Sequence, residues 1–167
     1  MGHLLTHALL WGLGLGAFLT VAFLGLLRLD PEMWLGDYPP DIQERFGPVG
    51  EKAGRQRLLL GIPVMTVALA VVVLGTIDFA RTGPSVPGFL DVALHTFVFL
   101  MVFNVVDLVL IDWLIVVWMR PEWVVLPGTE GMEGYGDYEF HFRAFLKGTV
   151  GIGVVSVLAG AIHAVMG

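Results

Sequence analysis

Four long apolar stretches constrain the fold of this chain more than any other feature of its sequence. They cover residues 4–27, 58–77, 89–119 and 144–165. The hydrocarbon core of a bilayer is about 30 Å thick, and about 20 apolar residues in an α-helix are needed to cross it. Each stretch reaches that length, so the sequence predicts four transmembrane helices.

The composition supports one membrane domain over residues 1–167. Hydrophobic residues make up 56% of the chain and charged residues only 14%, a balance outside the range of soluble globular proteins. We therefore predict an all-α fold, a four-helix bundle whose main partner is the lipid bilayer.

No basic stripe with interleaved aromatic residues is present, so nucleic acid is not an expected partner. Cysteine is absent, which excludes disulfides and thiolate metal sites.

The loops predict the orientation of the bundle. Two longer polar loops, residues 28–57 and 120–143, lie on one side of the membrane, and the first of them contains a predicted short surface helix at 41–46. The two termini and the short 78–91 turn lie on the other side. Eight of the nine Lys and Arg residues accompany the long loops, and only Arg81 lies opposite. The positive-inside rule therefore predicts cytoplasmic loops and both termini outside.

Small residues predict where the helices approach one another closely. Gly12 and Gly16 form a small-xxx-small pair on the first helix, and Ser156, Gly160 and Ala164 make a similar stripe on the fourth. Between transmembrane helices there is no hydrophobic driving force, and small residues allow the backbones to pack tightly. We expect both stripes to lie at helix–helix contacts.

Three polar residues interrupt the third helix in the segment NVVDLVLIDW, residues 104–113. An ionised aspartate at the centre of a membrane helix costs about 2.5–3.5 kcal/mol on insertion scales, so it requires a partner, a proton or water. At about 100° per residue in an α-helix, Asn104 and Asp107 share a face, whereas Asp112 points about 140° away from Asp107. The spacing therefore predicts two separate roles for the two acids.

Asp107 is the first candidate site. No Lys or Arg matches its depth, whereas the hydroxyl groups of Thr20, Thr66 and Ser156 are at its level when residues are counted inward along each helix. Such groups hydrogen-bond a neutral carboxylic acid or coordinate a small cation. We predict an ion- or proton-binding site at Asp107 and Asn104, with a purely interhelical hydrogen bond as the structural alternative.

Asp112 lies one to two turns closer to the long loops. Basic residues at the same side of the membrane are Arg57, Lys147 and Arg28, and long basic side chains can extend along an apolar surface to reach such an acid. We predict a structural ion pair between Asp112 and one of these three cations.

Histidines occur at the predicted outer ends of three helices. They are accompanied by two aspartates at a similar level, and the complete set is His3, His7, His95, His163, Asp78 and Asp91. Imidazoles four residues apart on a helix are a familiar metal-binding arrangement. Zinc or copper suits such ligands, and haem is the other cofactor considered. The structural alternative is that the amphipathic imidazole ring is simply tolerated at the membrane interface.

One segment carries a resemblance to known proteins. DWLIVVWMRPEWVVLPGTEG followed by DYEFHFRAFLKG, about residues 112–148, resembles an uncharacterised family of small four-helix bacterial integral membrane proteins. The resemblance implies a bacterial cytoplasmic (inner) membrane setting. It implies no activity, cofactor or catalytic residue.

Three classes of function remain open from the sequence. The first is a transport-related protein that binds a proton or cation at Asp107 and Asn104, as a homo-oligomer because four helices enclose little space. The second is a metal- or haem-binding assembly or redox factor, and the third is a structural accessory subunit of a larger membrane complex. No HExxH, GxSxG or CDP-alcohol-type acid cluster is present, so an enzyme is less favoured.

Overall fold

The computed structural model describes residues 1–166 and contains no strand within them. Its long helices are α1 (Gly2–Leu29), α3 (Glu51–Thr82), α4 (Phe89–Val106) continued by the π-helix η2 (Asp107–Met119), and α5 (Tyr138–Met166). The shorter elements are η1 (Pro31–Asp37), α2 (Pro40–Phe46), η3 (Glu122–Val124) and η4 (Glu133–Gly136). All four long spans are long and apolar enough to cross a membrane. The predicted all-α, four-helix, multi-pass membrane architecture is confirmed.

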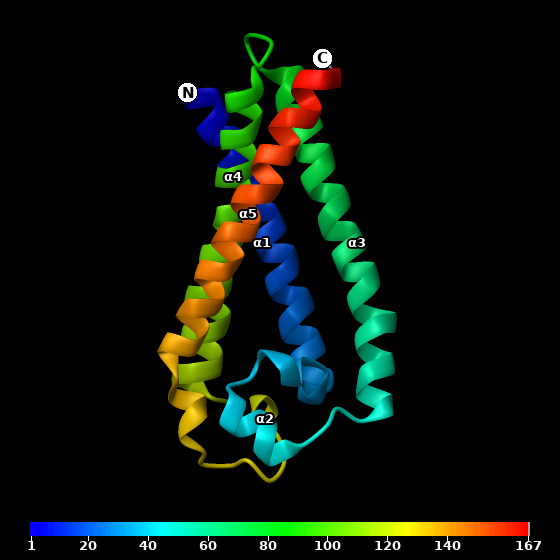
Figure 1. Cartoon of the computed structure of the whole chain (residues 1–167), viewed down its shortest axis with the longest axis vertical. Coiled ribbons are helices and arrows are strands. Elements are labelled where there is room, and N and C mark those ends of the chain that lie inside the picture. The colour runs from blue at the N-terminus through cyan, green and yellow to red at the C-terminus, as the bar shows by residue number, and fades with distance from the viewer. Residues whose placement is uncertain (167) are drawn as a thin grey trace.

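The two ends of the bundle carry different parts of the chain. Figure 1 shows both termini and the short turn between α3 and α4 at one end, called the terminal end below. The connections that contain α2, η3 and η4 lie at the opposite end, called the loop end. The long loops therefore share one end of the bundle, as the sequence predicts.

The helices are longer than the apolar stretches that predict them. α3 begins at Glu51 rather than at residue 58, and α5 begins at Tyr138 rather than at residue 144. Hydropathy marks only the part of a helix that suits the hydrocarbon core, whereas backbone hydrogen bonding continues into the polar interface. The predicted surface helix at 41–46 is confirmed as α2.

α4 is the central helix of the bundle, because α1 and α5 both pack along it. A Cβ atom built on Gly12 of α1 would lie 2.8 Å from the carbonyl oxygen of Phe99 and 2.8 Å from Cβ of Val102. A Cβ built on Gly160 of α5 would lie 2.7 Å from the carbonyl oxygen of Phe89. At these two positions only hydrogen fits, so glycine determines how closely both neighbours approach α4.

Of the remaining residues in the two predicted stripes, two are buried and one lies on the surface. Gly16 and Ser156 are buried, and Gly16 faces Phe103 and Val106 of α4. Ala164 is exposed, so the stripe on α5 ends one turn earlier than predicted. Close packing is needed only where α5 still lies against α4.

Large apolar side chains cover the outside of the spans. Exposed examples on α1, α3 and α5 are Leu10, Leu13, Leu58, Ile62, Leu69, Leu74, Val150, Val157 and Ile162. In a soluble protein such a continuous apolar surface would mark an interaction site. On helices of this length it is the surface expected to face lipid.

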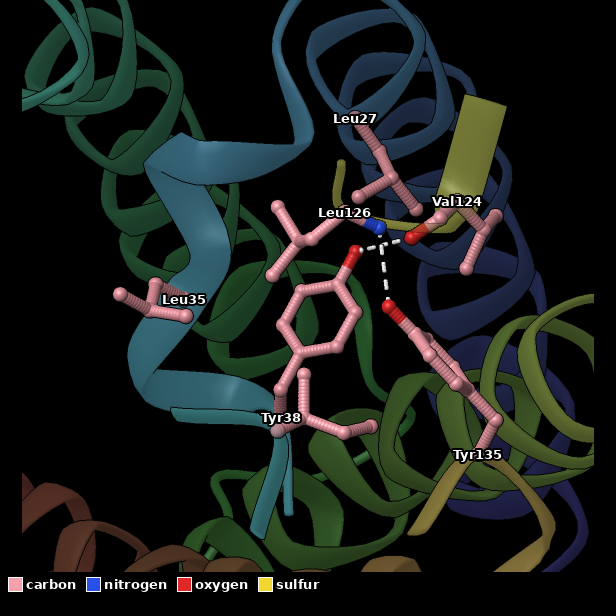
Figure 2. Close-up of a cluster of buried hydrophobic side chains, with 7 residues drawn as sticks. Leu27, Leu35, Tyr38, Val124, Leu126 and Tyr135 are labelled. Carbon is pink, nitrogen blue, oxygen red and sulfur yellow. Dashed lines mark hydrogen bonds between the residues drawn. The ribbon is translucent and has the colours of Figure 1, made fainter. Parts of the chain in front are cut away.

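The loops at the loop end form a folded cap, here called the loop cap, that consists of η1, α2, η3, η4 and their connections. Figure 2 shows its buried centre, where Tyr38 and Tyr135 point toward one another. The Tyr38 hydroxyl donates a hydrogen bond to the carbonyl oxygen of Val124 at 2.7 Å, and the Tyr135 hydroxyl accepts one from the backbone N–H of Leu126 at 2.8 Å. The first bond joins the first long loop to the second, and the second bond lies within the second loop.

The contact between Gly12 and α4 predicts the effect of one methyl group. Replacing Gly12→Ala should lower the free energy of unfolding by about 1–3 kcal/mol, the usual cost of overpacking a tight contact. Gly14→Ala is the matched control, since a Cβ there meets nothing within 4 Å, and it should leave stability unchanged or raise it through helix propensity. Denaturation of both variants in detergent measures the difference. Equal stabilities would show that α1 and α4 do not approach at Gly12.

Candidate functional site

A cavity of about 560 Å³ lies at the loop end between α1, η1, η2 and α5. Its ionisable lining consists of Asp37, Asp107, Asp112, His141, Arg143 and Lys147, together with Tyr38 and Tyr135. Phe23, Trp34 and Phe140 add aromatic walls. The volume falls within the range of roughly 300–1,000 Å³ that is usual for small-molecule sites.

The two aspartates of η2 face this cavity together. The residues of η2 that line it are Asp107, Ile111, Asp112 and Val116. The first and the last of these residues are nine positions apart and face the same cavity, so nine residues of η2 complete two turns. An α-helix completes two turns in about seven residues, so the predicted angle of about 140° between the two acids does not apply here.

The exposed face of η2 shows the same larger number of residues per turn. Val109, Leu110, Leu114 and Trp118 are exposed, and they again cover two turns in nine residue positions. At its end the backbone N–H of Arg120 donates to the carbonyl oxygen of Ile115, five residues earlier, at 2.9 Å. In such a π-helix, residues five apart lie on one side, and π-helical segments often occur at functional sites.

Asp112 pairs with His141 of α5. The distance from His141 Nδ1 to Asp112 Oδ1 is 3.2 Å, and the two side chains are 7% and 21% exposed, respectively. His141 reaches the acid because α5 begins at Tyr138 and carries the imidazole inside its first turns. This contact orients the ring of a residue that lines the cavity.

The three predicted cation partners of Asp112 make other contacts. The guanidinium group of Arg57 lies over the ring of Trp34 at 5.8 Å, and that of Arg28 lies over the ring of Trp123 at 5.9 Å. Lys147 lines the cavity. Within residues 1–166, none of the three brings a side-chain nitrogen within 4.0 Å of Asp112. The structure therefore replaces the predicted ion pair with an imidazole–carboxylate pair.

Asn104 belongs to a helix–helix contact rather than to the cavity. Its amide nitrogen donates to the Thr149 hydroxyl at 3.0 Å and to the Phe145 carbonyl oxygen at 3.3 Å, both on α5. Gly148 leaves room for it, because a Cβ there would lie 2.8 Å from Asn104 Oδ1. The structure thus separates Asn104 from Asp107, although the sequence predicts one site for both.

The three predicted hydroxyl ligands also lie away from the cavity lining. Thr66 is exposed on α3 and donates to the Ile62 carbonyl oxygen at 2.8 Å. Ser156 donates to the Ile152 carbonyl oxygen at 2.7 Å. The Thr20 hydroxyl is buried without a hydrogen-bond partner among the described residues. Counting residues along helices predicts depth, but it does not predict which face points toward Asp107.

Asp37 is a member of the cavity that the sequence analysis missed. It ends η1 and approaches the cavity from the loop cap. The surrounding protein raises the pKa of its carboxyl group above the ordinary value of 3.8, and Asp112 adds to the rise, while Arg57 and His141 oppose it. Asp37 is nevertheless exposed to solvent. A carboxyl group in this setting holds a proton more readily than an isolated carboxyl group does.

The basic residues of the lining do not neutralise the acids directly. Arg143 is paired with Glu139 one turn earlier on α5, at 2.6 Å from Nη2 to Oε1. Lys147 is exposed. The cavity therefore contains three carboxyl groups, with His141 as the only ionisable partner within 4.0 Å of any of them in the described part of the chain.

At the terminal end, four of the predicted metal ligands converge. Nδ1 of His7 lies 2.9 Å from Nε2 of His95, and Nε2 of His7 lies 3.0 Å from Oδ2 of Asp78. The ring of His3 is centred 5.6 Å from that of His7.

The other two predicted ligands have different roles. His163 Nε2 hydrogen-bonds the carbonyl oxygen of Pro87 at 3.0 Å, and the Asp91 carboxylate accepts a hydrogen bond from the backbone N–H of Gly88 at 2.9 Å. Within residues 1–166, no three His, Asp or Glu side chains are arranged to hold a metal ion. The geometry gives no support to a zinc, copper or haem site.

Comparisons with known proteins do not assign the chain to a family. No protein-family model, no curated protein and no solved structure matches it. The function is therefore inferred from the geometry of the cavity and of the terminal-end cluster.

A double-mutant cycle tests the partner of Asp112. Combining Asp112→Asn with His141→Asn should give a coupling energy of about 0.5–3 kcal/mol, as expected for side chains in contact. Combining Asp112→Asn with Arg57→Gln should be additive within about 0.5 kcal/mol. Unfolding free energies in detergent of the three single and two double variants, each relative to the unaltered protein, supply both coupling energies. Coupling to Arg57 as large as that to His141 would restore the ion pair predicted from the sequence.

Proposed function

We propose that this protein is a small transport-related membrane protein that binds a proton or small cation in the cavity at the loop end. One observation carries the proposal: three carboxyl groups from the loop cap and η2, and one imidazole from α5, line a single cavity. Among the residues that the structure describes, no Lys or Arg lies within 4.0 Å of these acids. The notable feature is this concentration of acids beside apolar helices.

The energetics favour a bound positive charge. Carboxylates that share a site repel one another, so at least one of them tends to hold a proton or a cation. Desolvation within a membrane domain adds to that tendency. Asp107, Asp112 and Asp37 interact electrostatically with one another, so a cation bound at one acid also relieves the repulsion felt by the others.

Access to the cavity favours binding from one side. The cavity includes residues of the loop cap and extends to Asp107 within the third span. Farther toward the terminal end, the bundle centre is an apolar cluster of Ala8, Leu15, Leu19, Ala68 and Phe99. This cluster separates the acids from the terminal end, which is the arrangement expected of a one-sided binding site.

The proposal includes a setting and an orientation. The excess of Lys and Arg near the loop end supports cytoplasmic loops and external termini by the positive-inside rule. A bacterial cytoplasmic membrane agrees with the resemblance of residues 112–148. A homo-oligomer would provide additional walls if the ion crosses the membrane, since one copy contains an apolar cluster on the direct route.

A ligand-stabilisation experiment tests the proposed site. A ligand that binds only the folded state raises its stability by about 2.7 kcal/mol when its concentration is 100 times its dissociation constant. We expect NaCl to raise the Tm of the detergent-purified protein more than choline chloride does at equal ionic strength. If the ligand is a proton, a fall in pH should raise the Tm instead. Asp107→Asn should remove most of this rise, because it deletes the deepest negative charge.

Glu44→Gln is the matched control, since Glu44 is exposed on α2 and does not line the cavity. It should retain the full response to sodium ions or protons. An Asp107→Asn protein that folds and keeps the complete response would reduce Asp107 to a structural role and contradict the proposed function.

A further inference from the structure

A continuous chain of hydrogen bonds crosses the terminal end of the bundle from α3 through α1 to α4. It runs from Asp78 Oδ2 to His7 Nε2 at 3.0 Å, and from His7 Nδ1 to His95 Nε2 at 2.9 Å. The Asp78 side chain is 45% exposed and that of His7 is 11% exposed, whereas His95 is completely buried. The chain therefore connects a solvent-exposed carboxylate to an enclosed imidazole.

The hydrogen-bonding rules for these groups fix the positions of the protons. An ionised carboxylate only accepts, so His7 donates to Asp78 through Nε2–H. The Nδ1 atom of a neutral His7 is then an acceptor, and His95 donates to it through Nε2–H. The Nδ1 atom of His95 is left as a bare lone pair. It is buried and has no hydrogen-bond partner among the described residues.

We propose that Asp78, His7 and His95 form a proton-binding site in which Nδ1 of His95 takes up one proton. An N–H bond forms at that atom as an O–H bond of a hydronium ion from the solvent breaks, and a water molecule is left. The proton shared between the two rings can move from Nε2 of His95 to Nδ1 of His7, so the positive charge spreads over both imidazoles. The net charge of the three groups changes from −1 to zero, with Asp78 as the counter-ion.

The packing around His95 favours a proton over a metal ion as the ligand. Phe79 stacks on the His95 ring, with centroids 4.1 Å apart and an angle of 6° between the planes. A cationic imidazole is attracted to the face of an aromatic ring. Both nitrogens of His7 are already engaged, so coordination of a metal by His7 would break an existing bond, whereas a proton preserves the chain.

The other ionisable groups at this end act on the chain in opposite directions. His3 of α1 is the nearest, and its protonation would oppose a charge on His7 because the rings are 5.6 Å apart. Arg81 of α3 is exposed and also positive. Asp91 of α4 and His163 of α5 are bonded to backbone groups of Gly88 and Pro87. Asp78 is the carboxylate in direct contact with the pair.

Nitrogen NMR of the histidine side chains tests this site directly. The full-length protein is labelled with ¹⁵N-histidine and reconstituted in phosphatidylcholine bilayers. It is titrated from about pH 8 to about pH 4, a range that covers ordinary and lowered histidine pKa values. The ring signals of His7 and His95 should shift together and report one added proton for the pair. Asp78→Asn should weaken proton binding by the pair about tenfold or more, since it removes the counter-ion. Asp91→Asn, the same change at the same end, should leave the titration unchanged.

Other outcomes would overturn the proposal. A His95 signal that stays neutral while His7 titrates alone would make the hydrogen-bond chain a static link. Equal titrations of the unaltered protein and Asp78→Asn would remove Asp78 as the counter-ion. Addition of one equivalent of zinc chloride that shifts the signals of His3, His7 and His95 together would identify a metal site instead. The cavity and this chain lie at opposite ends, so failure of cation binding at Asp107 does not affect this result.

Discussion

The winding of the third span from Asp107 to Met119 is the constraint on which the cavity depends. Because η2 is a π-helix, residues four and five apart return to the same side, and Asp107 and Asp112 both reach the cavity. In an α-helix the same residues would point in different directions. The loop cap and the first turns of α5 then add Asp37 and His141 to the pair.

Close packing elsewhere holds this span in place. Gly12 of α1 and Gly160 of α5 let both helices approach the backbone of α4, and Asn104 is bonded to α5 one turn before the π-helix begins. The polar residues of this span therefore have different roles at different positions. Asn104 fixes the helix contact, whereas Asp107 and Asp112 are left facing a cavity that opens at the loop end.

Much of the architecture follows from the sequence, since the length of each apolar stretch fixes four spans and the loop lengths place both long loops at one end. The polar extensions of α3 and α5 do not follow, because hydropathy does not record helix that continues into the interface. The sequence identifies Asp107 and Asp112 as unusual, but their common face requires the π-helix, for which the residues give no periodic signal. Asp37 and His141 reach the cavity only through the folding of the loop cap and the early start of α5.

A cysteine-accessibility scan of η2 tests the central claim most directly, because the chain has no native cysteine. Single cysteines are introduced from residue 105 to residue 118 and treated with a water-soluble thiol reagent in reconstituted membranes. The account predicts that the reactive positions are those of Asp107, Ile111, Asp112 and Val116, while those of Val109, Leu110 and Leu114 stay unreactive in lipid. Reaction at the positions of Asp107, Leu108, Ile111 and Ile115, with those of Asp112 and Val116 protected, would indicate an ordinary α-helix and contradict the shared cavity.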